Sequence, residues 1–380
     1  MSETPDIYPH VIPEIEDWPI YQLSEDRKAF VQEMDAYTLN RLQRYHTPVE
    51  LSDMIAKTIY LERIRIKEEP WKVDPPNEKQ FWRKIQKKLV GESLDRDEVK
   101  STQINEEILQ QIIHRYSEEI VGTFRKPTFL FARRFLTFFF NRLLNTSLGS
   151  RPGKNGKGKY SLQDRLMVKG QVEEVRSLMT KGTVVLLPTH SSNLDSVLIG
   201  YALDAFAGLP SFSYGAGLNL YNTGYTAYFM NRLGAYRVDR RKKNPIYLET
   251  LKAMSKLSIE RGVNSLFFPG GTRSRSGALE TKLKLGLLGT VVEAQRALFE
   301  RGRNTKVFVV PLVLSYHVVL EAKFLIEQYL RQMGKERYIK TRDETYRKRS
   351  IINFAWQVFS QGNDITLSFG RPMDVLGNFV

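Results

Sequence analysis

The stretch TVVLLPTHSSNLDSVLIGYALDAF, residues 183–206, decides the fold. It opens with an apolar run that ends at Pro188 and is typical of a buried strand in a parallel sheet. The polar turn His190–Asp195 follows, and the apolar spacing of 196–206 predicts a helix. A strand that passes through a short turn into a helix is the repeating unit of α/β proteins. The stretch therefore predicts a sheet covered by helices.

The same strand–helix alternation runs through the C-terminal half of the chain. Strands are predicted at residues 166–170, 211–214, 235–238, 265–268, 307–314 and 365–370, and helices at 171–181, 225–233, 245–261, 286–300 and about 320–333. We therefore predict an α/β fold with a mixed, mostly parallel sheet flanked by helices. Because proline cannot donate to a hydrogen-bond ladder, Pro311 predicts that its strand lies at an edge of the sheet or begins there.

The N-terminal half of the chain lacks β-rich runs, and its patterns predict helices. The clearest signal is Thr47-Pro48-Val49-Glu50, a capping box with proline at the first helical position. The basic, glycine-rich stretch RPGKNGKGKY, residues 151–160, is the expected linker. We therefore predict an N-terminal helical domain, residues 1–155, followed by an α/β domain, residues 160–380.

The linker nearly matches a nucleotide-binding P-loop. Gly153, Gly158 and Lys159 have the required spacing, but Tyr160 stands where serine or threonine would bind magnesium. No apolar strand leads into the stretch. We therefore interpret it as a loop and not as a nucleotide site.

The stretch FLFARRFLTFFFNRLLN, residues 129–145, has a helical pattern with a broad apolar side rich in phenylalanine. The remaining side is a narrow polar stripe that repeats every four residues: Arg133, Thr137, Asn141 and Asn145. Two interpretations stay open. The helix is buried in the core of the N-terminal domain, or it lies in a membrane interface with its arginines among the lipid headgroups.

Composition narrows the class of protein. The 380 residues contain no cysteine, which excludes disulfides and thiolate metal sites and fits a reducing cytoplasmic setting. Lysine and arginine number 57 against 42 acidic residues, and the net charge of +15 attracts anionic lipids, phosphorylated substrates or acidic proteins. The sequence predicts no signal peptide and no transmembrane helix. No nucleic-acid-binding motif is found, so we expect no nucleic-acid partner.

The turn that begins at His190 ends five residues later at Asp195. In a tight turn or at a helix start, residues four or five apart can point the same way, so the imidazole and the carboxylate can meet. A carboxylate that accepts from one ring nitrogen fixes the tautomer and raises the basicity of the other. Such a histidine takes a proton from an alcohol as a general base, an effect worth about 10²- to 10⁴-fold in rate. The alternatives are a structural histidine, and Ser192 or Asn193 as a simple helix cap.

Two later strand ends carry arginine. The segment 234–243 delivers Arg237 and then a run of cations, which is either a solvated charge run or part of an anion clamp. The segment FFPGGTRSRSG, residues 267–277, turns through glycines, where backbone N–H groups can face an anion. Its arginines, Arg273 and Arg275, offer the paired donors that phosphate accepts. We therefore predict a phosphate-binding loop, with an ordinary Gly/Ser turn as the alternative.

In this order and at these spacings, the blocks resemble the four motifs of the glycerophospholipid acyltransferase superfamily. The matching blocks are His190–Asp195, Gly234–Arg241, Phe268–Ser276 and Val309–Tyr316. Details such as Leu187-Pro188-Thr189-His190 resemble the branch that acylates glycerol 3-phosphate or dihydroxyacetone phosphate. The resemblance implies an acyltransferase that moves a fatty acyl group from a thioester to the hydroxyl of glycerol 3-phosphate, the first step of phospholipid synthesis.

The resemblance also implies roles for the matched residues. His190 is the general base, Asp195 orients it, and Pro311 belongs to the wall on the acyl side. The substrate phosphate is bound around Arg237, Arg273, Arg275, Gly271 and Thr272. No metal and no cofactor is implied, because a thioester is already activated. The co-substrate is acyl-CoA or acyl carrier protein.

One residue departs from the family's pattern. Gly270 stands where the third motif usually has glutamate, a residue that helps to hold the polar groups of the acceptor. The acceptor therefore stays open between glycerol 3-phosphate, lysophosphatidate and dihydroxyacetone phosphate. A non-catalytic, membrane-binding homologue is a further alternative. We expect a cytoplasmic protein that is peripherally associated with an anionic membrane surface.

Overall fold

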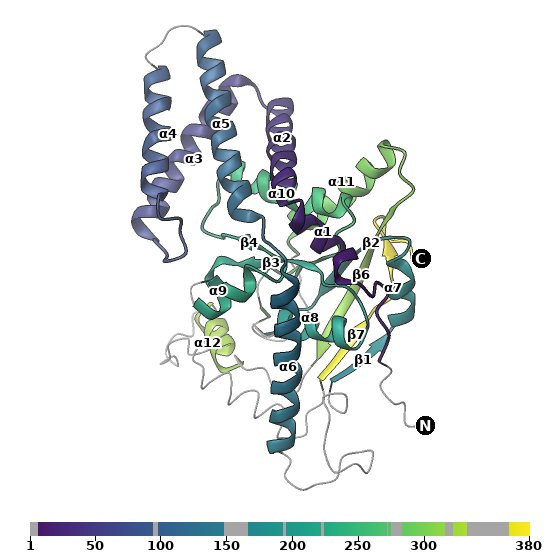
Figure 1. Ribbon diagram of the computed structural model, residues 1–380. Helices are drawn as coiled ribbons and strands as arrows, with labels where there is room; N and C mark the ends of the chain where they lie inside the picture. The colour runs from purple at the N-terminus through teal and green to yellow at the C-terminus, as the bar shows by residue number, and fades with distance from the viewer. Residues whose placement is uncertain are drawn as a thin grey trace. The chain divides into compact units, whose positions relative to one another are not determined.

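The structure is a computed structural model (Figure 1). It describes residues 7–93, 98–147, 166–192, 195–221, 224–271, 273–274, 283–315, 322–332 and 365–380. The chain forms two compact units. The α/β unit comprises Met1–Trp18, Phe129–Phe212 and Asn264–Val380, and the helical unit comprises Pro19–Thr128 and Ser213–Val263.

The α/β unit contains a mixed sheet with the strand order β1-β7-β6-β2-β5. Its strands are β1 (Leu166–Gly170), β2 (Gly182–Pro188), β5 (Ser265–Leu266), β6 (Lys306–Ser315), β7 (Ile365–Phe369) and β8 (Met373–Asp374), which pairs with β6. The pairs β1–β7, β2–β6 and β2–β5 are parallel, whereas β7 and β8 run antiparallel to β6. The predicted fold class, a mostly parallel mixed sheet with helices, is confirmed.

Two helical segments of this unit precede its first strand, and the others follow strands as the alternation predicts. The helical segments are η1 (Ile15–Asp17), α6 (Lys126–Ser147), α7 (Val172–Leu178), α8 (Asp195–Ala205), α11 (Leu285–Glu300) and α12 (Ala322–Gln332). α7 packs on β2 and α11 packs on β6. β2 has strands on both sides, and its residues Val184–Leu186 are fully buried. The apolar run that opens the quoted stretch is therefore an inner strand of the sheet.

The prediction that the strand of Pro311 lies at a sheet edge or begins there is wrong. Pro311 lies inside β6, between β2 on one side and β7 and β8 on the other. Its carbonyl accepts from Gly370 N–H at 2.9 Å, so the backbone of Pro311 points away from β2. On that side β8 pairs with residues 308–309 and β7 with 312–315. The missing N–H of Pro311 therefore falls at the break between two ladders, where no hydrogen bond is lost.

The helical unit groups five N-terminal helices with a later segment of the chain (Figure 1). The helices are α1 (Pro19–Glu25), α2 (Arg27–Tyr45), α3 (Pro48–Glu68), α4 (Glu78–Ser93) and α5 (Glu98–Ile120). The later segment contributes β3 (Ser213–Gly217), η3 (Leu218–Tyr221), α9 (Gly224–Met230), β4 (Ala235–Val238) and α10 (Pro245–Glu260). β3 and β4 pair in parallel, and α2, α4 and α10 all pack on α5.

The capping box predicted at Thr47 is confirmed. The Thr47 hydroxyl accepts from Glu50 N–H at 3.3 Å, and the Glu50 carboxylate accepts from Thr47 N–H at 2.8 Å. Hydrogen bonds from the backbone and the hydroxyl of Thr47 hold the pKa of Glu50 below its ordinary value. The reciprocal pair satisfies two N–H groups that the start of α3 would otherwise leave unbonded.

The predicted division into residues 1–155 and 160–380 stays a prediction, because its boundary lies outside the described residues. Within the described part of the chain, no helix is long and apolar enough to cross a membrane.

Candidate active site

The turn between β2 and α8 carries the predicted catalytic pair. β2 ends at Pro188, and α8 begins at Asp195. His190 Nδ1 lies 2.8 Å from Asp195 Oδ2, so the turn brings the two side chains into hydrogen-bond contact. The pair lies where a strand ends and a helix begins, at the carboxyl end of a parallel strand, where α/β sheets bind ligands.

Asp195 is held by donors from its own turn. Its side chain is 1% exposed, and Oδ2 also accepts from Ser191 N–H at 2.6 Å and from Ser192 N–H at 2.9 Å. Asp195 is the first residue of α8, where the helix dipole favours a negative charge. Backbone N–H groups of its own turn therefore help to stabilise the buried carboxylate.

The contacts of His190 select one tautomer. An ionised carboxylate only accepts hydrogen bonds, so Nδ1 carries the proton and donates to Asp195. In the neutral ring, Nε2 then has a free lone pair. The His190 side chain is 18% exposed and stacks on Phe268, with 4.1 Å between ring centroids and 26° between planes. The ring is fixed from two sides and keeps a basic nitrogen.

The predicted phosphate loop follows β5 and is bonded directly to the turn of His190. Ser274 N–H donates to the carbonyl of His190 at 2.7 Å, and Arg273, which is half-buried, immediately precedes Ser274. Gly271 has φ +71°, and a Cβ on it would lie 2.8 Å from Lys284 Cγ, so both conformation and space require glycine. The other predicted residues of this loop, Thr272 and Arg275, lie outside the described residues.

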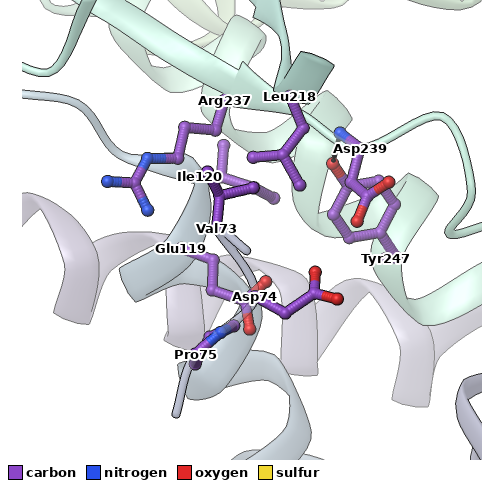
Figure 2. A pocket seen from close by; sticks show the side chains of 9 residues that line it. All are labelled: Val73, Asp74, Pro75, Glu119, Ile120, Leu218, Arg237, Asp239 and Tyr247. Carbon is purple, nitrogen blue, oxygen red and sulfur yellow. Dashed lines mark hydrogen bonds between the residues drawn. The ribbon is translucent and has the colours of Figure 1, made fainter. Parts of the chain in front are cut away.

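Arg237 belongs to the helical unit and lies on β4. Its Nε and Nη2 donate to Asn231 Oδ1 at 3.1 and 2.6 Å, and its guanidinium lies 5.2 Å from the ring centroid of Tyr221. Arg237 lines a cavity of about 20 Å³ together with Asp74 and Glu119, and Figure 2 shows its guanidinium pointing away from their carboxylates. Such a cavity has room for about one water molecule. The described contacts orient the guanidinium without neutralising it.

The cations after Arg237 divide into two kinds. Arg240 and Lys243 are exposed. Arg241 and Lys242 instead turn inward into a buried network, which we call the ionic cluster and which comprises Glu62, Arg65, Asp74, Glu78, Arg115, Glu119, Asp239, Arg241 and Lys242. The run is thus neither wholly solvated nor wholly available to an external anion.

Charge pairing in the ionic cluster offsets its burial. Burial opposes ionisation of Asp74, but hydrogen bonds from Arg241 and Trp71 N–H, with the charge of Arg65, keep the pKa of Asp74 below its ordinary value. Burial raises the pKa of Glu119, and the attraction of Lys242 only partly offsets that rise. Lys242 bonds to Glu119 and lies 4.8 Å from the ring centroid of Tyr116. The cluster therefore holds the β4–α10 connection, which carries the second motif.

The role of Pro311 in the wall on the acyl side stays a prediction. Pro311 pairs with Leu187 in the register of β6 and β2, close to the end of β2 that leads to His190. Sequence reasoning missed Asn231, Tyr221 and Phe268 as partners of the predicted site residues. No motif marks the first two, and Phe268 reads as part of a strand. Among the described residues, no three His, Asp or Glu side chains are grouped as metal ligands.

Comparison with known proteins agrees with these motifs. Residues 168–315 match the family model Acyltransferase. Curated relatives named glycerol-3-phosphate acyltransferase include proteins of Alteromonas mediterranea (24% identical over 61% of this chain and 25% of the relative), Pseudomonas aeruginosa (24%, over 75% and 30%) and Aeromonas hydrophila (27%, over 65% and 27%). The chain thus spans less than a third of these relatives' length. Residues 168–315 thus match the Acyltransferase family model, and the chain is similar to part of proteins named glycerol-3-phosphate acyltransferase.

Proposed function

We propose that the chain is an acyltransferase that moves a fatty acyl group from a thioester to the hydroxyl of glycerol 3-phosphate. The observation that carries the proposal is the hydrogen-bond contact between His190 Nδ1 and Asp195 at the end of a parallel strand, because a neutral ring that donates from Nδ1 has its lone pair on Nε2. The hydrogen bond from Ser274 to His190 supports it, because it ties the arginine loop to the base. The names of the curated relatives supply the acceptor.

The reaction needs one proton to move twice. His190 Nε2 takes the proton of the acceptor hydroxyl as the oxygen attacks the thioester carbonyl, and a carbon–oxygen bond forms. The carbon–sulfur bond then breaks, and the leaving thiolate receives the proton from the imidazolium. Asp195 stabilises the imidazolium between the two transfers, since its carboxylate stays bonded to Nδ1. No metal and no further cofactor takes part in this scheme.

The acceptor phosphate is held by arginine in this proposal. Arg237 and Arg273 are the described residues that would bind it, with Arg275, Gly271 and Thr272 completing the loop. Fixing the acceptor supplies proximity, which turns a bimolecular encounter into an oriented reaction. The donor is acyl-CoA or acyl carrier protein, both of which are acidic and suit a chain of net charge +15.

Because Gly270 replaces a glutamate of the motif, other acceptors and another activity are competing proposals. Without the glutamate usual at this position, lysophosphatidate and dihydroxyacetone phosphate are the competing acceptors. A homologue without catalysis that binds anionic membranes is the competing function. Because the product carries an acyl chain and a phosphate, the proposal also includes peripheral association with an anionic membrane surface.

The test measures acyl transfer by the purified chain with each acceptor at equal concentration, using acyl-CoA and acyl carrier protein in turn. We expect His190→Ala to lower kcat by about 10²- to 10⁴-fold with glycerol 3-phosphate. His114→Ala is the matched control, because His114 Nδ1 also contacts a carboxylate, Asp35 Oδ2, at 2.7 Å but lies in the helical unit. Equal turnover by wild type and His190→Ala would refute the mechanism, and preference for another acceptor would correct the substrate.

A further inference from the structure

Helix α6 exposes a stripe of phenylalanine. Phe131, Phe135 and Phe138 are 57%, 50% and 69% exposed. They stand four and three residues apart, which places them on one face of the helix. The rings of Phe131 and Phe135 stack with centroids 6.2 Å apart and planes 13° apart. We call this face the phenylalanine stripe.

Two residues of the polar stripe of α6, Arg133 and Thr137, contact the protein. Arg133 Nη1 donates to Asp204 Oδ1 at 3.3 Å, and the hydroxyls of Thr137 and Tyr201 lie 2.8 Å apart. Both partners are on α8, in the same unit as this part of α6. A helix on the surface of a soluble protein usually has the opposite orientation, with the apolar face inward. Burial of the phenylalanines in a protein core, one of the two interpretations of this stretch, is therefore wrong for the three exposed residues.

Two arginines border the phenylalanine stripe. Arg134 and Arg142 are exposed; Arg134 follows Phe131 by three residues, and Arg142 follows Phe138 by four. Residues 126–147 contain no aspartate or glutamate. An apolar face with arginines at its border, on a helix without acidic residues, is the pattern of a helix that lies in the interface of an anionic bilayer.

We propose that α6 docks the α/β unit on an anionic lipid surface, with the phenylalanine stripe among the acyl chains and Arg134 and Arg142 at the phosphates. The proposal deepens the proposed function, on which it rests for the membrane-bound product. A second copy of the chain fits the stripe less well, because self-association would bring the arginines together with no acidic residue of α6 to pair them. At about 1.5 Å per residue, the 22 residues of α6 give about 33 Å of helix to lie along the interface.

Vesicle flotation tests the docking surface. Wild type is compared on phosphatidylcholine vesicles with and without about 30 mol% phosphatidylglycerol, the anionic component. We expect F131S/F135S/F138S to bind at least about tenfold more weakly. The control F299S/V49S/Y60S removes three side chains that are at least as exposed but lie outside α6, and we expect it to bind like wild type. R134Q/R142Q should lose about fivefold in affinity for each arginine on anionic vesicles and little on neutral ones.

A second measurement guards against misfolding of the triple variant. In F135W, we expect the added tryptophan to be quenched by brominated lipid beyond the quenching of the wild-type tryptophans. Equal vesicle binding by wild type and F131S/F135S/F138S would overturn the proposal. The proposal would also be overturned if the wild type were a dimer, the triple variant were a monomer, and both bound lipid equally. Transfer to soluble glycerol 3-phosphate from a short-chain donor, without vesicles, is measured on the same variants. A variant that no longer floats with vesicles but keeps this soluble activity has lost membrane docking and not catalysis.

Discussion

The turn of Asp195 and the ionic cluster bury charge in opposite ways. Asp195 is a buried carboxylate that contacts His190 Nδ1 and accepts from two backbone N–H groups of its own turn, all within five residues. The ionic cluster instead joins groups from distant segments, since Lys242 and Glu119 are 123 residues apart and Arg241 and Asp74 are 167 apart. A charge that is held by nearby backbone N–H groups is fixed in position and can orient a catalytic side chain. A charge that is held by other charges serves to fix distant segments together.

The largest effect that tests this contrast is expected for Asp195→Asn. The amide can still accept from the backbone, but it can also donate toward Nδ1 of His190 and so favour the tautomer without a basic Nε2. We expect kcat to fall about 10³- to 10⁴-fold while the urea midpoint of unfolding changes little. Steady-state kinetics and urea unfolding of the same preparation give both values. A large loss of stability with normal kcat would mean that Asp195 acts as a structural residue.

The next effect concerns the ionic cluster and is expected in stability. Lys242→Met removes the buried lysine partner of the half-buried Glu119, and breaking a buried pair costs about 3–5 kcal/mol. Lys243→Met, one residue further and exposed, is the matched control, for which we expect less than about 0.5 kcal/mol. Urea unfolding measures both. Equal stability of the two variants would show that the pairing of Lys242 contributes nothing net.

The same contrast explains how much the sequence could predict. The pairing of His190 and Asp195 follows from local spacing, and so do the capping box of Thr47 and the buried strand β2. The partners of Lys242 do not, because nothing in a cationic run tells which of its members turns inward. Pro311 shows the same limit, since the proline rule holds for a complete ladder and β6 changes partners at that residue.

Helix α6 marks a further limit of sequence patterns. Its periodicity predicts a helix with a polar and an apolar side, but it cannot tell which side the protein covers. That choice depends on the polar partners Asp204 and Tyr201, which α8 supplies 64 or more residues later. The contacts of Arg237 could not be predicted from the sequence either, because Asn231 lies in a turn that no motif marks.

A smaller effect is expected for Asn231→Ala, which removes the acceptor of both Arg237 hydrogen bonds. If Asn231 positions Arg237 for the acceptor phosphate, KM for glycerol 3-phosphate rises about fivefold to tenfold, or about 1–1.4 kcal/mol. We expect kcat and the KM of the acyl donor to change little, and Asn231→Asp, which keeps an acceptor oxygen, to restore part of the lost affinity. A fall in kcat at constant KM would assign Asn231 a role other than positioning.

The smallest effect is the contribution of Asp74 to the pH dependence of stability. The folded pKa of Asp74 lies below the unfolded value of 3.8, so the unfolded chain binds more protons near that pH. The stabilisation is present above pH 3.8 and is lost as the pH falls through the lower folded pKa. Asp74→Asn should therefore be less stable at neutral pH, with a smaller further loss on acidification below pH 4 than wild type or Asp53→Asn, which changes an exposed carboxylate of α3. Urea midpoints between about pH 6 and 3 measure this slope, and parallel curves for all three proteins would mean that the charge of Asp74 does not stabilise the ionic cluster.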